Sequence, residues 1–143
     1  MKNMKVIAEP WVVYFDEFAI SKRNNKDKIG KWIVHFSNRK QIEQVCQEAV
    51  EFGIIEEAKH TNADDGVACF YLECDDIETH KSIIAFLLDN NCLPKTKTGR
   101  LCNIAYKLDS QTYAGEYGKK FKSHINLEQF LDLDTCEFGD DID

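Results

Sequence analysis

The most regular hydrophobic pattern in the chain lies within residues 38–52. Apolar side chains recur there at i, i+3, i+4, i+7 and i+8, which is the spacing of one buried helix face. They are Ile42, Val45, Cys46, Ala49 and Val50. Ser37 before the segment favours an N-cap and Gly53 after it is typical of a helix end, so we predict a helix over 38–52.

A second helix is predicted after Asp75. Asp75 and Glu78 have the three-residue spacing of a capping box, and the helical pattern ends near Asn90. The apolar residues that we assign to its buried face are Ile77, Ile84, Ala85 and Leu88. Further along the chain, Asn126 is expected to cap a short helix that runs to about Leu131.

Six other segments have the composition or the alternation of β-strands. They cover residues 11–20, 31–36, 54–61, 66–74, 101–108 and 112–117. The polar residues 21–28 predict an exposed loop. A short turn separates 54–61 from 66–74, which predicts a hairpin. The run 66–74 is almost entirely apolar, so it is expected to be buried on both faces.

These elements predict an α+β fold with a mostly antiparallel, curved sheet of about six strands. Two long helices cannot cover both faces of such a sheet, so we place both on one face. Residues 1–131 then form a single domain. The other face stays partly open, and a function is expected there.

Charge is unevenly distributed along the 143 residues, of which 43% are hydrophobic. Seven acidic residues follow Lys122 and no lysine or arginine does, so this end accounts for the whole net charge of −7. We therefore expect residues 132–143 to form an acidic, solvated tail. The remaining body is electrically balanced, which argues against a nucleic-acid partner because few counterions would be released on binding.

The beginning of the sequence lacks the apolar run of a secretory signal, and no segment approaches the roughly 20 apolar residues of a membrane span. We expect a cytoplasmic protein without membrane association, whose six cysteines remain thiols. No C-x-x-C pair occurs, and Cys69 and Cys74 should point to opposite faces of one strand. No metal site and no cofactor are therefore predicted.

Strand alternation assigns several cationic side chains to the open face. If Trp32 faces the helices with Val34 and Phe36, its neighbours on the strand face away. The polar residues expected on this face are Lys31, His35, Lys59, Lys107 and Asp109, with Arg100, Lys95 and Lys97 on a neighbouring loop. Such a cluster can bind phosphate or another anion. The alternative is that these residues only keep an uncovered sheet face solvated.

Residues 106–117 contain the pattern Tyr-Lys-x-Asp-x-x-Thr-Tyr-x-Gly-x-Tyr. In this pattern the chain resembles the basophilic-leukaemia-expressed protein family. The parallel extends over about residues 28–118, through Gly30-Lys31-Trp32, Lys59 and the apolar run 66–72. The resemblance implies a fold like that of the cap-binding translation initiation factor. It also implies a domain catalogued among phosphothreonine lyases.

Lyases of that kind use one lysine as a base, one histidine as an acid and further basic residues on the phosphate. The positions that match the family pattern are Lys31, Lys59, Lys107, Asp109, Thr112 and Tyr113. The resemblance thus implies catalytic roles for Lys59 or Lys107, with His35 as the acid, although no motif fixes His35. It implies binding roles for Lys31, Asp109, Thr112 and Tyr113, and we add Arg100 from the neighbouring loop as a further binding residue. Arginine, the usual bidentate phosphate ligand, occurs only three times.

Three functions are compatible with the sequence. The first is a small binding or regulatory module, such as an inhibitor encoded by a phage or mobile element, that engages a protein partner through the open face. The second is an enzyme that recognises a phosphorylated ligand. The third is RNA binding, because residues 31–108 have the βαββαβ order of an RNA-recognition domain, but the strand at 66–72 has Val67 where a stacking aromatic belongs. We predict the first, and enzymatic activity stays open.

Overall fold

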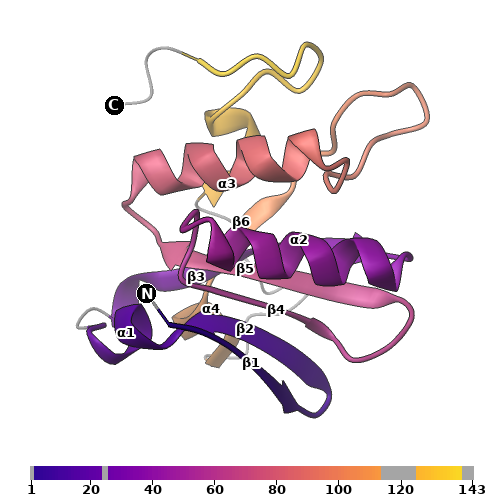
Figure 1. Ribbon diagram of the computed structural model, residues 1–143. Coiled ribbons are helices and arrows are strands. Elements are labelled where there is room, and N and C mark those ends of the chain that lie inside the picture. The colour runs from indigo at the N-terminus through magenta and orange to yellow at the C-terminus, as the bar shows by residue number, and fades with distance from the viewer. Residues whose placement is uncertain (1, 24–25, 114–124, 140–143) are drawn as a thin grey trace.

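The described residues, 2–23, 26–113 and 125–139, contain seven strands that form one antiparallel sheet in this computed structural model (Figure 1). The strand order is β1-β2-β4-β5-β3-β6-β7. The strands are β1 Asn3–Ala8, β2 Trp11–Asp16, β3 Ile29–Phe36, β4 Glu57–Thr61, β5 Gly66–Glu73, β6 Ala105–Leu108 and β7 Ile125–Asn126. The helices are α1 Glu17–Ser21, α2 Arg39–Glu51, α3 Ile77–Asp89 and α4 Asp109–Tyr113, with 3-10 turns at Lys26–Lys28 and Leu127–Gln129. The predicted α+β fold with a curved sheet is confirmed.

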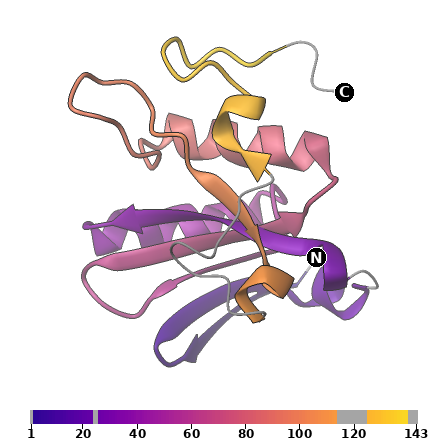
Figure 2. The same cartoon turned by 180° about the vertical axis from the view of Figure 1, so that it is seen from behind.

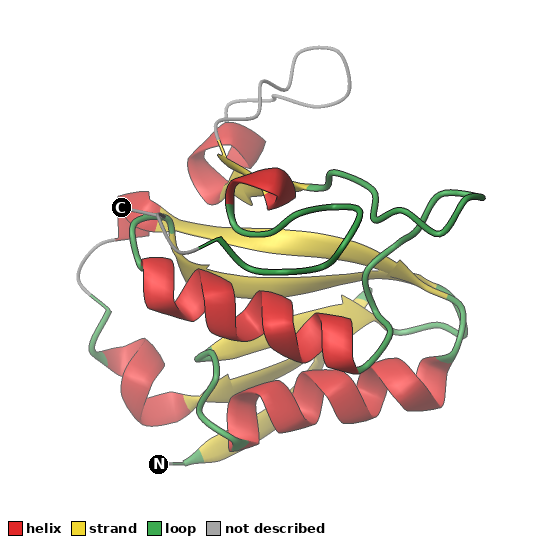
Figure 3. Ribbon diagram, turned by 90° about the horizontal axis from the view of Figure 1, so that it is seen from above, coloured by secondary structure: helices red, strands yellow, loops and turns green. Residues whose placement is uncertain are grey.

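The helices α2 and α3 lie side by side over one face of the sheet (Figure 3). The main core fills the space between these helices and the sheet, with Trp32, Phe70 and Tyr106 among its largest fully buried side chains. Figure 2 shows the other face, where the short α4 contacts β3 and β6. Helices α2 and α3 have 13 residues each, and none of the helices in the described part of the chain could cross a bilayer.

Helix α2 follows the predicted pattern. Its five buried residues are the five that the sequence indicates, and Gly53 ends the helix with φ of 71°. The cap is one residue later than expected, because the side chain of Asn38, not Ser37, accepts a hydrogen bond from the Gln41 amide at 3.1 Å. The free thiol of Cys46 is buried in this core, and burial raises its pKa.

Helix α3 differs from the prediction in its N-cap residue and in the residues of its buried face. Asp76 caps it by accepting from the Thr79 amide, whereas the carboxylate of Asp75 binds Lys28 at 2.7 Å. The buried residues are His80, Ile83, Ile84 and Leu87. The predicted stripe contained Ala85 and Leu88 and omitted the histidine, because a polar side chain gave no sign that it would be buried.

Two histidines, His60 and His80, are fully buried and form hydrogen bonds through both ring nitrogens. The Trp32 indole N–H donates to Nδ1 of His80 at 3.0 Å, and Nε2 of His80 then donates to the Cys74 carbonyl at 3.0 Å. Nδ1 of His60 donates to the Thr61 carbonyl, and the Tyr14 hydroxyl donates to its Nε2 at 3.0 Å. Each ring is therefore held in one neutral tautomer. Burial lowers the pKa of both histidines and raises that of Tyr14 to about 12.

The N-terminal region differs from the prediction in two ways. Strand β1, which the sequence did not indicate, pairs with β2. The predicted strand over 11–20 ends at Asp16, whose side chain accepts hydrogen bonds from the amides of Phe18 and Ala19 and so starts α1. Strand β1 is mostly exposed, so it lacks the alternation between buried and exposed residues by which strands are recognised.

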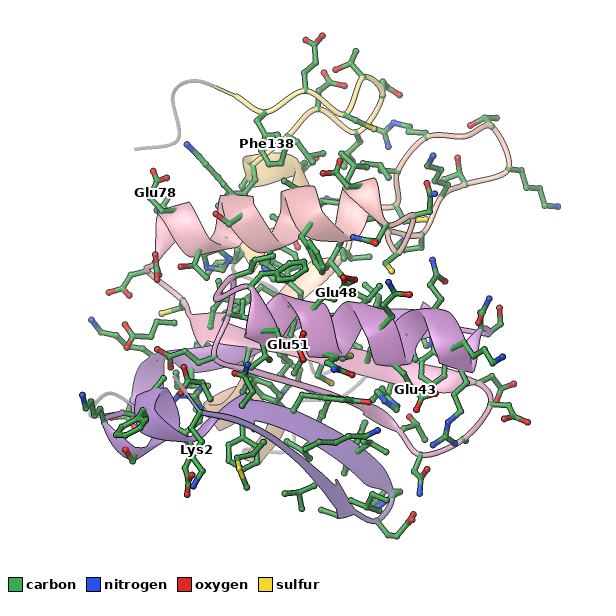
Figure 4. All side chains as sticks on the ribbon, in the orientation of Figure 1. Lys2, Glu43, Glu48, Glu51, Glu78 and Phe138 are labelled. Atoms are coloured by element: carbon green, nitrogen blue, oxygen red, sulfur yellow. The ribbon has the colours of Figure 1, made fainter. Side chains whose placement is uncertain are left out.

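The C-terminal region is not a solvated tail from residue 132 onward. Leu133 is only 4% exposed and belongs to the main core, and its carbonyl accepts from the Leu101 amide at 3.0 Å. Leu131 pairs with Phe138, which lies beside α3 (Figure 4). The acidic residues stand on the outside of this turn, where Asp132 accepts from two following amides. The ordered domain therefore extends at least to residue 139.

Three further predictions near the C-terminus need correction. The strand expected over 101–108 forms only over Ala105–Leu108. Helix α4 occupies 109–113, where part of an extended segment was predicted, and residues 114–117 of that segment lie outside the described residues. Asn126 precedes the 3-10 turn Leu127–Gln129 but makes no capping hydrogen bond with its side chain. Short helical turns of this kind have too few residues for a recognisable period.

Candidate functional site

The sheet register gathers the predicted lysines on the open face. One row across the strands consists of Glu57 on β4, Tyr71 on β5, Lys31 on β3 and Lys107 on β6. Lys59 belongs to the adjacent row and pairs with Cys69 on β5. Alternation along β3 is confirmed, because Trp32, Val34 and Phe36 are buried in the core between the helices and the sheet.

Aromatic rings separate the ammonium groups of this face. The Nζ atom of Lys59 lies 4.0 Å from the ring centroid of Trp11 and 5.7 Å from that of Tyr71. The Nζ atom of Lys31 lies 6.0 Å from the Tyr71 ring on the other side. Rings at these distances attract cations through their electron-rich faces. We call Trp11, Lys31, Lys59, Tyr71 and Asp109 the cation–aromatic patch.

Sequence reasoning missed the two aromatic members of the patch, Trp11 and Tyr71. Tyr71 belongs to the apolar run 66–74, which gave no sign of a site. Trp11 stands at the start of β2 on the open face, opposite Thr61, and so next to the row of Lys59. The β2–β4 register pairs Val13 with Lys59, and Trp11 lies two residues before Val13 on the same face. Trp11 could therefore be placed beside Lys59 only once this register was known.

Lys31 is nearly inaccessible for a charged residue, with 7% of its surface exposed. Its ammonium donates to Oδ1 of Asp109, the first residue of α4, at 2.7 Å. Beneath it, Ile29, Cys69 and Tyr71 form a small second core with Ile33 packed against it. The open face therefore carries a layer of buried apolar side chains, and charged groups cover this layer. It is less exposed to solvent than a sheet face that has only polar side chains.

Gly30 allows β6 to approach this part of β3. A Cβ atom at this position would lie 2.6 Å from the Lys107 carbonyl oxygen and from the Tyr106 ring. The Tyr106 hydroxyl passes this point to donate to the Leu72 carbonyl at 2.6 Å. Glycine before Lys31 thus brings Lys107 and α4 close to the patch.

His35 and Arg100 do not join the lysines. His35 is exposed on the predicted face, but it is four residues from Lys31 along β3, which corresponds to about 13 Å at the rise of a strand. Arg100 lies on the loop between α3 and β6 and pairs with Asp134 at 2.9 Å. Alternation along a strand predicts the sheet face on which His35 lies, but not how far His35 is from residues on other strands. Alternation does not constrain the position of Arg100 at all, because Arg100 lies on a loop.

The remaining predicted site residues divide into two groups. Lys107 and Asp109 lie at the patch, Lys107 half-buried and opposite Lys31 in the register. The backbones of Thr112 and Tyr113 belong to α4, but their side chains lie outside the described part of the chain. Among the described residues, no three His, Cys, Asp or Glu side chains are grouped so that they could hold a metal ion.

A cavity of about 250 Å³ adjoins the patch and shares Tyr71 with it. Its charged lining residues are Glu56, Glu73, Asp76 and Arg23, so acids predominate. Arg23 is held by Glu57 at 2.8 Å and Glu56 at 3.4 Å. The hollow lies at the end of the sheet, where its lining comes from residues 53–56 after α2 and from Asp76 and Thr79 at the start of α3, and it meets the lysine-rich face at Tyr71. On the helix side of the sheet, Glu43, Glu48 and Glu51 project from α2 (Figure 4).

The Lys31–Asp109 ion pair should contribute measurably to stability. We expect Lys31→Met and Asp109→Asn, made singly and together, to show a coupling free energy of about 1–3 kcal/mol in urea unfolding, because the pair is shielded from water. The matched control is Lys28–Asp75, which has the same 2.7 Å separation but is exposed on both sides, and its coupling should be near the detection limit. Equal couplings for the two pairs would contradict the role of burial.

The chain was compared with family models and with curated proteins. No family model matches it, and no curated protein matches it. The resemblance of residues 106–117 to a known family therefore stays a prediction.

Proposed function

We propose that the protein is a binding module that engages a protein partner through the open face of its sheet. The observation that carries this proposal is the cation–aromatic patch, to which β2, β3, β4 and β5 each contribute a side chain. Tryptophan and tyrosine are the residues that most often supply binding energy at protein interfaces. Here both lie beside lysines on a rigid sheet.

The chemistry of the neighbouring cavity favours a peptide over a simple anion. A ligand that covers both surfaces would place an acidic group on the lysines and a basic group in the hollow that contains Glu56, Glu73 and Asp76. Protein segments carry both kinds of side chain, whereas free phosphate carries only the first.

The arrangement of the titratable groups supports binding more than catalysis. His60 and His80 use both ring nitrogens in structural hydrogen bonds. Burial raises the pKa of the Cys69 thiol, which opposes formation of a nucleophilic thiolate between the lysines. His35, the histidine assigned as a general acid, lies one row beyond Lys59 and two rows beyond Lys107, the two lysines assigned as the base, so neither lysine is its neighbour.

The proposal can be tested with peptides selected from a displayed random library against the full chain. Trp11→Ala and Lys59→Ala should each weaken the selected peptides about tenfold or more, since anchor residues at interfaces have effects of this size. Phe52→Ala is the matched control, because Phe52 is 63% exposed and ends α2 on the other side of the sheet. Selected peptides that tolerate both patch substitutions but lose affinity in the Phe52 variant would overturn the proposal.

A second candidate is a phosphate-recognising enzyme. The specific observation in its favour is the register, which places Lys31 opposite Lys107 and brings Lys59 into the adjacent row. Incubation with a phosphothreonine peptide, followed by mass spectrometry, tests it. Loss of phosphate that disappears in Lys59→Met and Lys107→Met, with folding retained, would establish this function. An intact peptide together with unchanged NMR spectra in inorganic phosphate would remove it.

A further inference from the structure

The two edges of the sheet differ greatly in the described residues. β7 at one edge has two residues, whereas β1 at the other has six, and Figure 1 shows β1 along the lower border of the sheet. Five of the six β1 residues are exposed. An exposed strand of this length presents a row of backbone donors and acceptors on which another strand can pair.

The hydrogen-bond register shows which groups of β1 face outward. The amide of Glu17 donates to the Lys2 carbonyl at 2.8 Å, so Lys2 turns its backbone groups toward β2. Backbone direction alternates along an antiparallel strand. In the register with β2, Met4, Val6 and Ala8 therefore also bond to β2. The N–H and C=O groups of Asn3, Lys5 and Ile7 point to the free edge.

Strand β1 lacks the usual protection of an edge. Edge strands are commonly guarded by proline, by a bulge or by a lysine that projects over the edge. The ammonium of Lys5 instead lies 5.6 Å from the Tyr14 ring, back over its own sheet. Val6 is 41% exposed and Ile7 is 65% exposed. The edge thus offers apolar side chains on both sheet faces in addition to open backbone groups.

We propose that β1 pairs antiparallel with β1 of a second copy of this chain, around a two-fold axis beside Val6. In this register Val6 lies opposite the partner's Val6 and Met4 lies opposite the partner's Ala8. The outward-facing backbone groups of Lys5 meet those of the partner's Ile7. Two seven-stranded sheets then join into one continuous sheet, and their open faces lie on the same side.

The side chains of β1 favour this register and this partner. An axis at Lys5 would place two lysines directly opposite each other, which is destabilising across a strand pair. An axis at Val6 places Lys5 opposite an apolar residue, with the partner's Lys5 and the partner's Glu9 both diagonal to it, so that no like charges are directly opposed. An axis at Ile7 would pair Lys5 with Glu9, but Glu9 lies in the turn after β1 and not in the strand. The strand is thus complementary to itself in its apolar side chains, with Val6 opposite Val6 and Met4 opposite Ala8. A foreign peptide strand on the same edge is the alternative outcome of the test.

Sedimentation equilibrium of the full chain over a concentration series tests the proposal, and the register makes opposite predictions for two variants. Ile7→Glu would place a carboxylate opposite Lys5 twice in the dimer and should tighten it about tenfold. Ile7→Lys would oppose like charges and should weaken it by a similar factor. Val6→Asp, which opposes two carboxylates at the axis, should give a monomer. Because Ile7 is exposed, both Ile7 variants should fold, and far-UV circular dichroism checks this.

Phe52→Asp is the control variant, since it removes an exposed apolar residue away from the edge and should leave the dimer unchanged. A wild-type chain that stays monomeric up to roughly 1 mM would overturn the proposal. So would equal effects of Ile7→Glu and Ile7→Lys, because they would exclude the register centred on Val6. The proposal is independent of peptide binding on the open face, since Val6→Asp leaves Trp11 and Lys59 in place.

Discussion

Lowering the pH below about 6.5 should reduce the free energy of unfolding, with a slope of at most about 2.7 kcal/mol per pH unit. The cause is the pair of buried neutral histidines, His60 and His80. Each should contribute about 1.4 kcal/mol per pH unit where the unfolded chain takes up a proton that the folded chain excludes. Both rings are 0% exposed. A proton on Nδ1 of His80 would oppose the Trp32 indole N–H, which can only donate. A proton on Nε2 of His60 would require the Tyr14 hydroxyl to turn from donor to acceptor and would place a charge in the core.

The direction follows from the lowered pKa of both groups. In the unfolded chain a histidine titrates near its ordinary pKa of 6.5, whereas burial lowers the pKa in the folded protein. The stabilising contribution is therefore complete above pH 6.5 and is lost as the pH falls toward the folded-state pKa. Asp75 and Asp132, whose pKa values are lowered by hydrogen bonds, act in a separate window below their ordinary pKa of 3.8.

Urea unfolding at a series of pH values, followed by tryptophan fluorescence, measures this slope. His80→Gln should reduce it to about half, because one of the two proton-excluding sites is gone. His35→Ala is the control variant, since it removes a histidine that is exposed and not buried. A free energy of unfolding that is constant between pH 7 and pH 5 would show that these histidines are not held neutral.

Leu133→Ala should lower the free energy of unfolding by about 2–5 kcal/mol, the usual loss for a leucine removed from a packed core. Leu133 is buried with Leu101 and Leu127 under the C-terminal turn. Deletion of residues 132–143 should be still more damaging, because it also removes Phe138 and the backbone bond from the Leu101 amide. Thermal unfolding monitored by circular dichroism provides the comparison.

Two controls separate packing from charge at this end. Asp134→Ala changes an exposed residue whose ion pair with Arg100 is on the surface, so it should have little effect. Deletion of residues 140–143 spares every packed residue named above and should also be neutral. If deletion of 132–143 left stability unchanged, the segment would be the solvated tail that its acidic composition indicates.

The sequence predicted best where burial is periodic. The five-residue stripe of α2 and the alternation of Trp32 and Lys31 along β3 both follow from which side of an element faces the core. Strand β1 escaped prediction because almost no residue in it is buried. The stripe of α3 was misplaced because His80 is made compatible with burial by its bonds to the Cys74 carbonyl and to the Trp32 indole, and Trp32 lies 48 residues away in sequence.

In the candidate site, too, the sequence predicted the features that depend on one strand and not those that depend on contacts between strands. The face of Lys31, Lys59 and Lys107 could be predicted, because alternation depends on one strand at a time. The neighbours of these residues could not, because Trp11 reaches Lys59 through the β2–β4 register and Asp109 reaches Lys31 through α4. Long-range pairing also decides that His35 and Arg100 stay apart from the lysines. No local pattern contains that information.

The two tryptophans provide an internal reference for the binding surface. The Trp11 ring belongs to the cation–aromatic patch, whereas the Trp32 indole N–H is buried and bound to His80. In a ¹H–¹⁵N NMR titration with a selected peptide, the indole signal of Trp11 should shift and that of Trp32 should stay in place. A peptide that binds while the Trp11 indole signal does not move, with changes confined to α2 and α3, would contradict recognition by the open face.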